Sequence, residues 1–167
     1  GDAKDLLFQR YSQYHVISRN EFLVTLTKPR NMTVNVFGEA KTTGAFTLPG
    51  TNTAFNVISA AGGPTDIGSV RRIKVIRGNE TIPLDVYEFM SNPGVEKNYF
   101  LQNNDYIHIP VAQKVVTIQG AVTRPMTYEL LDNENLLQLV KFAGGAKANA
   151  FLSFVQVTRF MNDKTII

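Results

Sequence analysis

A cluster of basic residues is the best candidate for a binding function in this sequence. It consists of Arg71, Arg72, Lys74 and Arg77. Alternate side chains of a β-strand share a face, so Arg72 and Lys74 would lie together, opposite the apolar residues that flank Lys74. Such a face can contact an acidic sugar or a neighbouring subunit, and it can also be an ordinary solvated strand surface. Aromatic residues are not interleaved with the cluster as single-stranded nucleic acids require, so we expect no nucleic-acid partner.

The two histidines, His15 and His108, do not predict catalysis or metal binding. His108 alternates with Ile107 and Ile109, which is typical of the solvent face of a strand. No serine, aspartate or glutamate motif frames either histidine as a catalytic triad would. A zinc site needs three or four ligands at metal spacing, and the chain has no cysteine to add to them. We therefore predict no catalytic residue, no metal and no cofactor.

Two further patterns have structural explanations that we prefer to chemical ones. Asp85 and Glu88 could act as a carboxylate pair, but their spacing is that of a capping box at the start of a helix. Gly-Gly pairs occur twice, and each follows a predicted helix, whereas a phosphate-binding loop follows a strand. Glycine can close a helix in the left-handed conformation. We predict turn and helix-stop roles for six glycines: Gly38, Gly62, Gly63, Gly120, Gly144 and Gly145.

The composition is that of a globular protein. The chain has 167 residues, of which 44% are hydrophobic and 19% charged, and its net charge is +3. This charge is too small to indicate nucleic-acid binding. The sequence contains no apolar run long enough to span a bilayer and no signal peptide. Its last residues have the pattern of an apolar strand, and we expect the chain to be part of a longer protein.

The sequence contains an internal repeat with an offset of 82 residues, as between Gly38 and Gly120 (120 − 38). At this offset the apolar positions and the paired glycines of the two copies stay in register. The copies also share a strand pattern of period two and a helical pattern of period 3.6. We expect the helices to face two separate cores through these residues: Ala54, Val57, Ile58 and Ala61, and Leu136, Leu139, Val140 and Ala143.

Each copy predicts the order strand, strand, helix, strand, strand. The first copy adds a short helix after Asp85 and a last strand over 106–110. A helix packed on a small mixed sheet gives an α+β fold. This order of elements, present twice, resembles two tandem β-grasp (ubiquitin-like) domains.

The motifs resemble those of the soluble-ligand-binding β-grasp (SLBB) domains of bacterial outer-membrane polysaccharide export proteins. In order, they are Val34-x-Val36-x-Gly38-Glu39-Ala40, Phe46-x-Leu48, Ala60-Ala61-Gly62-Gly63, Arg72-x-x-Val75-x-Arg77, Leu84-Asp85-Val86-Tyr87 and Leu101-x-x-x-Asp105-x-Ile107-x-Ile109-Pro110. The second copy begins the series again and ends after Arg159. Two motifs depart from the family pattern: the usual Pro-Gly turn is split between Gly44 and Pro125, and Asn104-Asp105 replaces Gly-Asp.

The resemblance implies a non-enzymatic, periplasmic part of a channel that exports capsule or exopolysaccharide. It implies stacked rings of identical subunits, contact with the exported polymer and an inner-membrane chain-length regulator as a further partner. Association with the outer membrane would depend on parts outside this sequence. The alternative is a module that recognises a soluble ligand or glycan and belongs to no channel.

The repeat also predicts a domain organisation. Residues 1–16 form a helix that ends a preceding export-signature domain, as the resemblance implies. Residues 31–112 form the first β-grasp domain, inserted into a second, discontinuous domain of residues 17–30 and 113–167. The basis is a predicted strand over 21–27, which the offset places at the equivalent of the last strand of copy one (105 − 82 = 23). This strand would complete the sheet of copy two in its own chain or in a neighbouring one.

Overall fold

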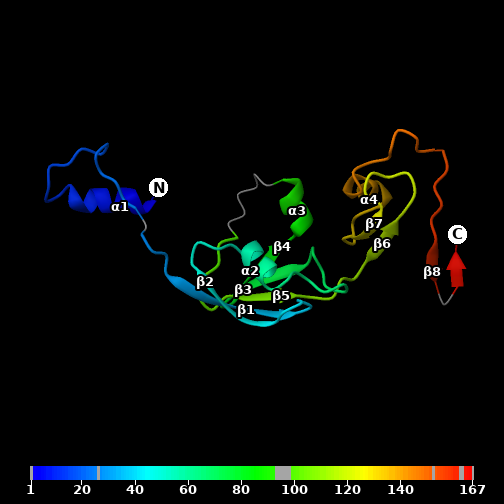
Figure 1. Ribbon diagram of the computed structural model, residues 1–167, viewed down its shortest axis with the longest axis horizontal. Coiled ribbons are helices and arrows are strands. Elements are labelled where there is room, and N and C mark those ends of the chain that lie inside the picture. The colour runs from blue at the N-terminus through cyan, green and yellow to red at the C-terminus, as the bar shows by residue number, and fades with distance from the viewer. Residues whose placement is uncertain (1, 26, 93–98, 152, 162–163, 167) are drawn as a thin grey trace.

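A computed structural model describes residues 2–25, 27–92, 99–151, 153–161 and 164–166. An N-terminal helix leads through an irregular segment to two units that follow one another (Figure 1). The first unit contains β1 (Asn31–Gly38), β2 (Gly44–Pro49), α2 (Ala54–Ala60), β3 (Ile73–Arg77), β4 (Glu80–Leu84), α3 (Val86–Ser91) and β5 (Tyr106–Ile109). The second contains β6 (Val115–Ile118), β7 (Met126–Glu129), α4 (Leu136–Phe142), β8 (Arg159–Met161) and β9 (Lys164–Ile166).

The first unit is a five-stranded mixed sheet with the order β2-β1-β5-β3-β4. Its two hairpins, β1–β2 and β3–β4, are antiparallel. The central strand β5 joins them, since it is parallel to β1 and antiparallel to β3. Strand β5 alternates buried and more exposed residues, so that Ile107 and Ile109 face the core while Tyr106 and His108 face outward. This arrangement of strands and helices is the predicted α+β, β-grasp-like fold.

The core of the first unit forms where α2 packs on the sheet. Val57 and Ala61 on the helix and Val34, Ile73 and Ile107 on the sheet are all 0% exposed. The predicted helix face is therefore confirmed, with Ala54 and Ile58 also buried. Helix α3 begins at Asp85, whose carboxylate accepts hydrogen bonds from the N–H groups of Tyr87 and Glu88, as the capping pattern predicted.

The second unit repeats the β1–β2–α2 part of the first. Strands β6 and β7 form an antiparallel pair, and α4 packs against it through Leu139 and Ala143. Two of the predicted core residues on this helix are less buried: Leu136 is 42% exposed and Val140 is half-buried. The sheet on which they would pack is only two strands wide, so it covers less of the helix.

Backbone hydrogen bonds of the first unit recur in the second unit between residues 82 positions further along the chain. In the first unit the N–H groups of Lys41 and Thr42 donate to the carbonyls of Gly63 and Ala61. In the second, those of Thr123 and Arg124 donate to Gly145 and Ala143. Both Gly-Gly pairs have positive φ, between 79° and 84°, and end their helices as predicted.

Gly38 shows why its turn requires glycine. Its φ is 86°, and a Cβ there would lie 2.2 Å from the carbonyl oxygen of Ile109. Gly120 has the same left-handed φ of 87°, but nothing lies near its Cβ position. The second unit has no described strand in the place of β5, which removes the close neighbour.

The N-terminal segment corrects one prediction. Helix α1 (Asp2–Tyr11) forms within residues 1–16, where a helix was predicted, and ends at Tyr11, earlier than that prediction. The predicted strand over 21–27 does not form, because residues 22–25 have no regular secondary structure; Leu26 lies outside the described residues. A strand needs a partner, and residues 21–25 pair with no described strand. The discontinuous domain built on this strand remains a prediction.

The second unit also differs from the prediction in the position of a strand. The strand predicted around Val155 and Val157 is irregular until Arg159, where β8 begins. The N-cap residues of helices α2 and α4 are Thr53 and Asn135. Among the described residues, no helix has the length and apolar character needed to cross a bilayer.

Candidate functional site: an arginine cluster between the two units

Arg71 lies where the two units meet, and ion pairs connect it to both. Its guanidinium contacts the carboxylate of Asp85 in the first unit, with an Nη2–Oδ2 distance of 2.9 Å. It also forms an ion pair with Glu134 of the second unit. The side chain of Arg71 is 5% exposed and those of both carboxylates 14%, so this network is largely shielded from water.

Two aromatic rings enclose the same guanidinium. The Cζ atom of Arg71 lies 4.9 Å from the ring centroids of both Tyr87, on α3, and Phe142, on α4. These rings contact each other edge to face, with centroids 5.0 Å apart. Tyr87 and Phe142 also pack against the core of the second unit. The cation is therefore held by cation–π contacts as well as by hydrogen bonds, which suits the planar guanidinium better than a lysine ammonium.

Glu129 makes the second connection between the units. Its carboxylate accepts hydrogen bonds from the Ser69 hydroxyl at 2.7 Å and from the N–H groups of Val70 and Arg71 at 2.9 and 3.1 Å. Glu129 belongs to β7 and is 4% exposed, while its three donors belong to the loop before β3. The buried carboxylate thus accepts from two backbone donors of this loop, and the Arg71 N–H also donates to the Ser69 hydroxyl at 3.1 Å. We call Ser69, Arg71, Asp85, Tyr87, Glu129, Glu134 and Phe142 the inter-unit cluster.

The pKa shifts agree with this arrangement. Burial alone would lower the pKa of Arg71, but its hydrogen bonds to Glu134 and Asp85 and their negative charges raise that pKa above its usual value. Burial would raise the pKa of Glu134, but hydrogen bonds from Arg71 and the Leu131 N–H lower it on balance. Burial also raises the pKa of the Tyr87 phenol. Arg71 and Glu134 are therefore charged at neutral pH, and the Tyr87 phenol is neutral.

The lowered pKa of Glu134 predicts that the inter-unit cluster stabilises the fold less at acidic pH. A carboxylate whose pKa is lower in the folded state stabilises the fold above its unfolded pKa of 4.5 and loses that contribution as the pH falls through the folded value. We expect the urea midpoint to fall more steeply below about pH 4.5 in the wild type than in Glu134→Gln, which cannot titrate at this position. Equal slopes for the two proteins would show that Glu134 does not contribute.

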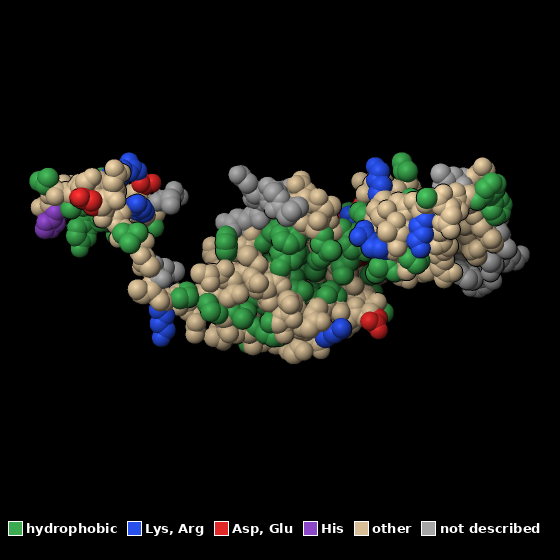
Figure 2. Space-filling view, turned by 45° about the horizontal axis from the view of Figure 1, so that its top comes forward, with side chains coloured by type: hydrophobic (Ala, Val, Ile, Leu, Met, Phe, Trp, Pro, Cys, Tyr) green, Lys and Arg blue, Asp and Glu red, His purple; other side chains and the backbone are tan. Residues whose placement is uncertain are grey.

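The rest of the predicted basic cluster divides among separate places. Arg72 forms an ion pair with Asp132 of the second unit, and Arg77 holds the buried Asp105 at 2.7 Å. Lys74 is exposed on the outer face of β3, beside His108 in the sheet register. On the face shown in Figure 2, Lys and Arg side chains do not merge into one basic patch. Contact of these residues with a ligand or a neighbouring subunit remains a prediction.

Sequence reasoning identified Arg71 but missed its partners in the second unit. Glu129 occupies the position that Thr47 has in the first repeat (129 − 82 = 47), and Thr47 lies on an exposed face. A charged residue at a position where the two copies differ was the only signal. It does not show which surface of the other unit would cover it.

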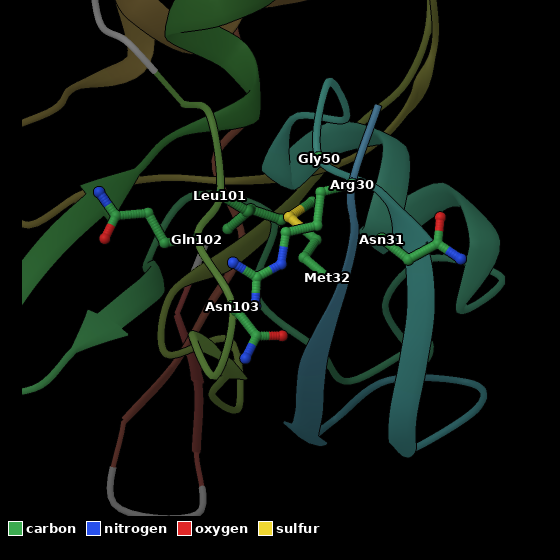
Figure 3. A pocket seen from close by; sticks show the side chains of 7 residues that line it. All are labelled: Arg30, Asn31, Met32, Gly50, Leu101, Gln102 and Asn103. Carbon is green, nitrogen blue, oxygen red and sulfur yellow. The ribbon is translucent and has the colours of Figure 1, made fainter. Parts of the chain in front are cut away.

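A shallow pocket lies at the start of β1 (Figure 3). The side chains of Arg30, Met32 and Leu101 converge there, and Asn103 lies beside them, whereas Asn31 and Gln102 point away. Met32 and Leu101 are 4% and 5% exposed. The Asn103 side chain is already used, since its Oδ1 accepts from the Thr33 N–H. The pocket therefore offers one guanidinium above an apolar floor.

The histidines have no catalytic surroundings in the described part of the chain. His108 stacks on Phe37 with ring centroids 4.6 Å apart, on the outer face of the sheet, and His15 stacks on Tyr11. Residues 2–25, 27–92, 99–151, 153–161 and 164–166 contain no group of three or more His, Asp or Glu side chains that could hold a metal ion.

Comparison with known proteins agrees with the repeat. The family model of the SLBB domain matches twice, over residues 33–85 and 115–167. The two matches begin 82 residues apart (115 − 33) and together cover more than half of the chain. A search of curated proteins found no match. The chain therefore belongs to the SLBB domain family and carries two of its domains in tandem.

Proposed function

We propose that this chain is a non-enzymatic, periplasmic part of a bacterial polysaccharide export channel. SLBB domains are known in polysaccharide export proteins and form a ligand-binding, non-catalytic family. In this role the two units form part of the wall of a conduit, stack as rings with identical subunits and contact the exported polymer. An inner-membrane chain-length regulator is the further partner that this role implies.

The inter-unit cluster is the observation that carries the proposal. A conduit needs domains that keep their relative positions while a polymer passes. The cluster provides this by fixing α3 and the loop before β3 of the first unit to β7 and α4 of the second. It contains acids, a base and aromatic rings, but they are engaged with one another, and each of them is buried or half-buried. Such an arrangement supports the relative placement of the units better than it supports a reaction.

The proposal is tested in the cell that makes the protein. Deleting the gene is expected to remove polysaccharide from the cell surface while polymer synthesis continues and the polymer accumulates inside. Wild-type protein should restore the surface polymer. The variant Arg71→Ala, which weakens the inter-unit cluster, should restore less at equal protein abundance. Unchanged surface polysaccharide after deletion would contradict the export role.

The second candidate function is recognition of a small soluble ligand, which the pocket at Arg30 favours. An acidic monosaccharide would place its carboxylate on the guanidinium and a ring face on the apolar floor. Titration calorimetry with glucuronate, and with glucose as the neutral control, tests this. Binding of glucuronate that Arg30→Ala removes, with export unaffected by the same variant, would favour recognition over the conduit.

A further inference from the structure

The second unit has an open position in its sheet. In the first unit β5 lies between β1 and β3 and joins the two hairpins. In the second unit β6–β7 is the equivalent of β1–β2, and the equivalent of β3 is residues 155–159, of which only Arg159 belongs to a strand, β8. The pairs β6–β7 and β8–β9 form two separate sheets, and no described strand lies between them. The edge of β6 that does not pair with β7 carries backbone groups able to pair with another strand, and so do the irregular residues 155–158. We call the space between β6 and residues 155–159 the open slot.

Apolar side chains beside the open slot are exposed to solvent. Ile73 and Val75 in the first unit are 0% and 2% exposed in the core of that unit, where Val75 lies beside Ile107 of β5. The equivalent residues of the second unit, Val155 and Val157, are 63% and 40% exposed. The same repeat position is thus buried where a central strand is present and open where it is absent. A strand in the slot would remove this apolar surface from water.

The N-terminal segment has the sequence of such a strand. Ile17-Ser-Arg-Asn-Glu-Phe-Leu23 resembles Leu101-Gln-Asn-Asn-Asp-Tyr-Ile107, which leads into β5 and forms its start. The offset here is 84 residues (105 − 21), two more than in the rest of the repeat, so Glu21 and not Leu23 is the equivalent of Asp105. The turn before β5 is also reproduced: the Asp105 N–H donates to the Gln102 carbonyl at 3.2 Å, and the Glu21 N–H donates to the Ser18 carbonyl at 3.0 Å. Leu23 and Val24 are 83% and 40% exposed.

We propose that residues 21–25 of one copy of this chain enter the open slot of a second copy. The register of β5 transfers directly. Ile107 lies beside Val36 on β1 and Val75 on β3. By the two offsets, Leu23 lies between Ile118 and Val157 of the second copy, parallel to β6 and antiparallel to residues 155–159. The inserted strand joins β6 to residues 155–159 as β5 joins β1 to β3 in the first unit, by main-chain pairing of the β-augmentation type.

Charge complementarity fixes the same register. In the first unit Arg77 forms an ion pair with Asp105, which is 1% exposed. The equivalents are Arg159 (77 + 82) and Glu21 (105 − 84), so the inserted strand brings an acid to the base of the slot. Arg159 is exposed, and Glu21 is exposed in the irregular segment. One-residue slips of the strand would separate this pair and turn Leu23 outward.

The same chain cannot supply its own strand. The carbonyl of Arg30 accepts from the Gly50 N–H at 2.7 Å, which fixes Arg30 at the start of β1. The second unit leaves from the other end of β1, where Gly38 pairs with Ile109, and lies beyond that end (Figure 1). Strand β1 has eight residues, about 23 Å along its axis. Residues 26–30 reach at most about 17 Å, and the inter-unit cluster holds the second unit in place.

The resulting contact is head to tail, since the donor and acceptor surfaces differ. Contacts of this type build rings when the rotation closes. In the proposed channel, this strand exchange is the contact between neighbouring subunits. Only the closing of a ring rests on the proposed function. Strand exchange itself is independent of the polymer.

Disulfide trapping tests the exchange, because the chain has no cysteine of its own. Val24→Cys and Gln156→Cys occupy the positions equivalent to His108 and Lys74, which are neighbours on the outer face of the first sheet. A mixture of the two single variants, one of them tagged, is expected to give a disulfide-linked heterodimer after oxidation. The double variant should give a ladder of oligomers. The matched control pairs Val24→Cys with Lys74→Cys, whose slot β5 already fills, and should give no specific product.

The outcomes separate this inference from the export role. A fast-migrating, internally linked monomer of the double variant would overturn exchange between copies, and so would equal crosslinking in the control. Glu21→Arg or Arg159→Glu alone should weaken association by about tenfold, and the two together should restore it. If the polymer still requires the protein for export while crosslinking fails, the exchange is wrong and the proposed function stands.

Discussion

Replacing Arg71 with alanine is expected to lower the free energy of unfolding by about 3–5 kcal/mol, the usual cost of removing one partner from a buried ion pair. The substitution leaves the carboxylates of Asp85 and Glu134, each 14% exposed, without their shared cation. It also empties the space between the rings of Tyr87 and Phe142. Urea unfolding followed by circular dichroism measures the loss. We also expect a single transition to separate into two as the units uncouple.

Two control variants make this prediction specific. Arg72→Ala removes an arginine from the next position, but its partner Asp132 is 82% exposed, so the expected loss is within about 1 kcal/mol. Arg71→Met combined with Glu134→Gln removes cation and acid together and should cost less than Arg71→Ala, because less uncompensated charge stays buried. If Arg71→Ala and Arg72→Ala cost the same, the cluster does not hold the units together.

The sequence predicted the fold where the repeat could be compared with itself. The glycine pairs, the helix faces and the strand order of the first unit follow from local patterns, and these patterns occur twice. The inter-unit cluster could not be predicted in the same way. Glu129 and Glu134 have no counterparts in the first copy that contact another unit, so the repeat carries no information about them.

The prediction of equivalent strands failed for a related reason. Val155 and Val157 have the apolar alternation of Ile73 and Val75, and on pattern alone the two segments are equally good strands. In the first unit β5 supplies the hydrogen-bonding neighbour for β3. In the second unit residues 155–158 have no described neighbour on that side and remain irregular. A strand depends on its partner as much as on its own side chains, and the partner lies elsewhere in the sequence.

Replacing Leu139 with alanine is expected to cost about 2–5 kcal/mol, because Leu139 is 1% exposed and α4 has few other buried side chains. It lies in the core of the second unit with Tyr128, Leu130 and Ala143, and a cavity in so small a core has little surrounding structure to fill it. Leu137, on the same helix and 65% exposed, is the matched control, since Leu137→Ala removes the same atoms with an expected change within about 0.5 kcal/mol. Chemical denaturation of dilute protein measures both. Equal losses for the two variants would show that α4 does not pack through the face that carries Leu139.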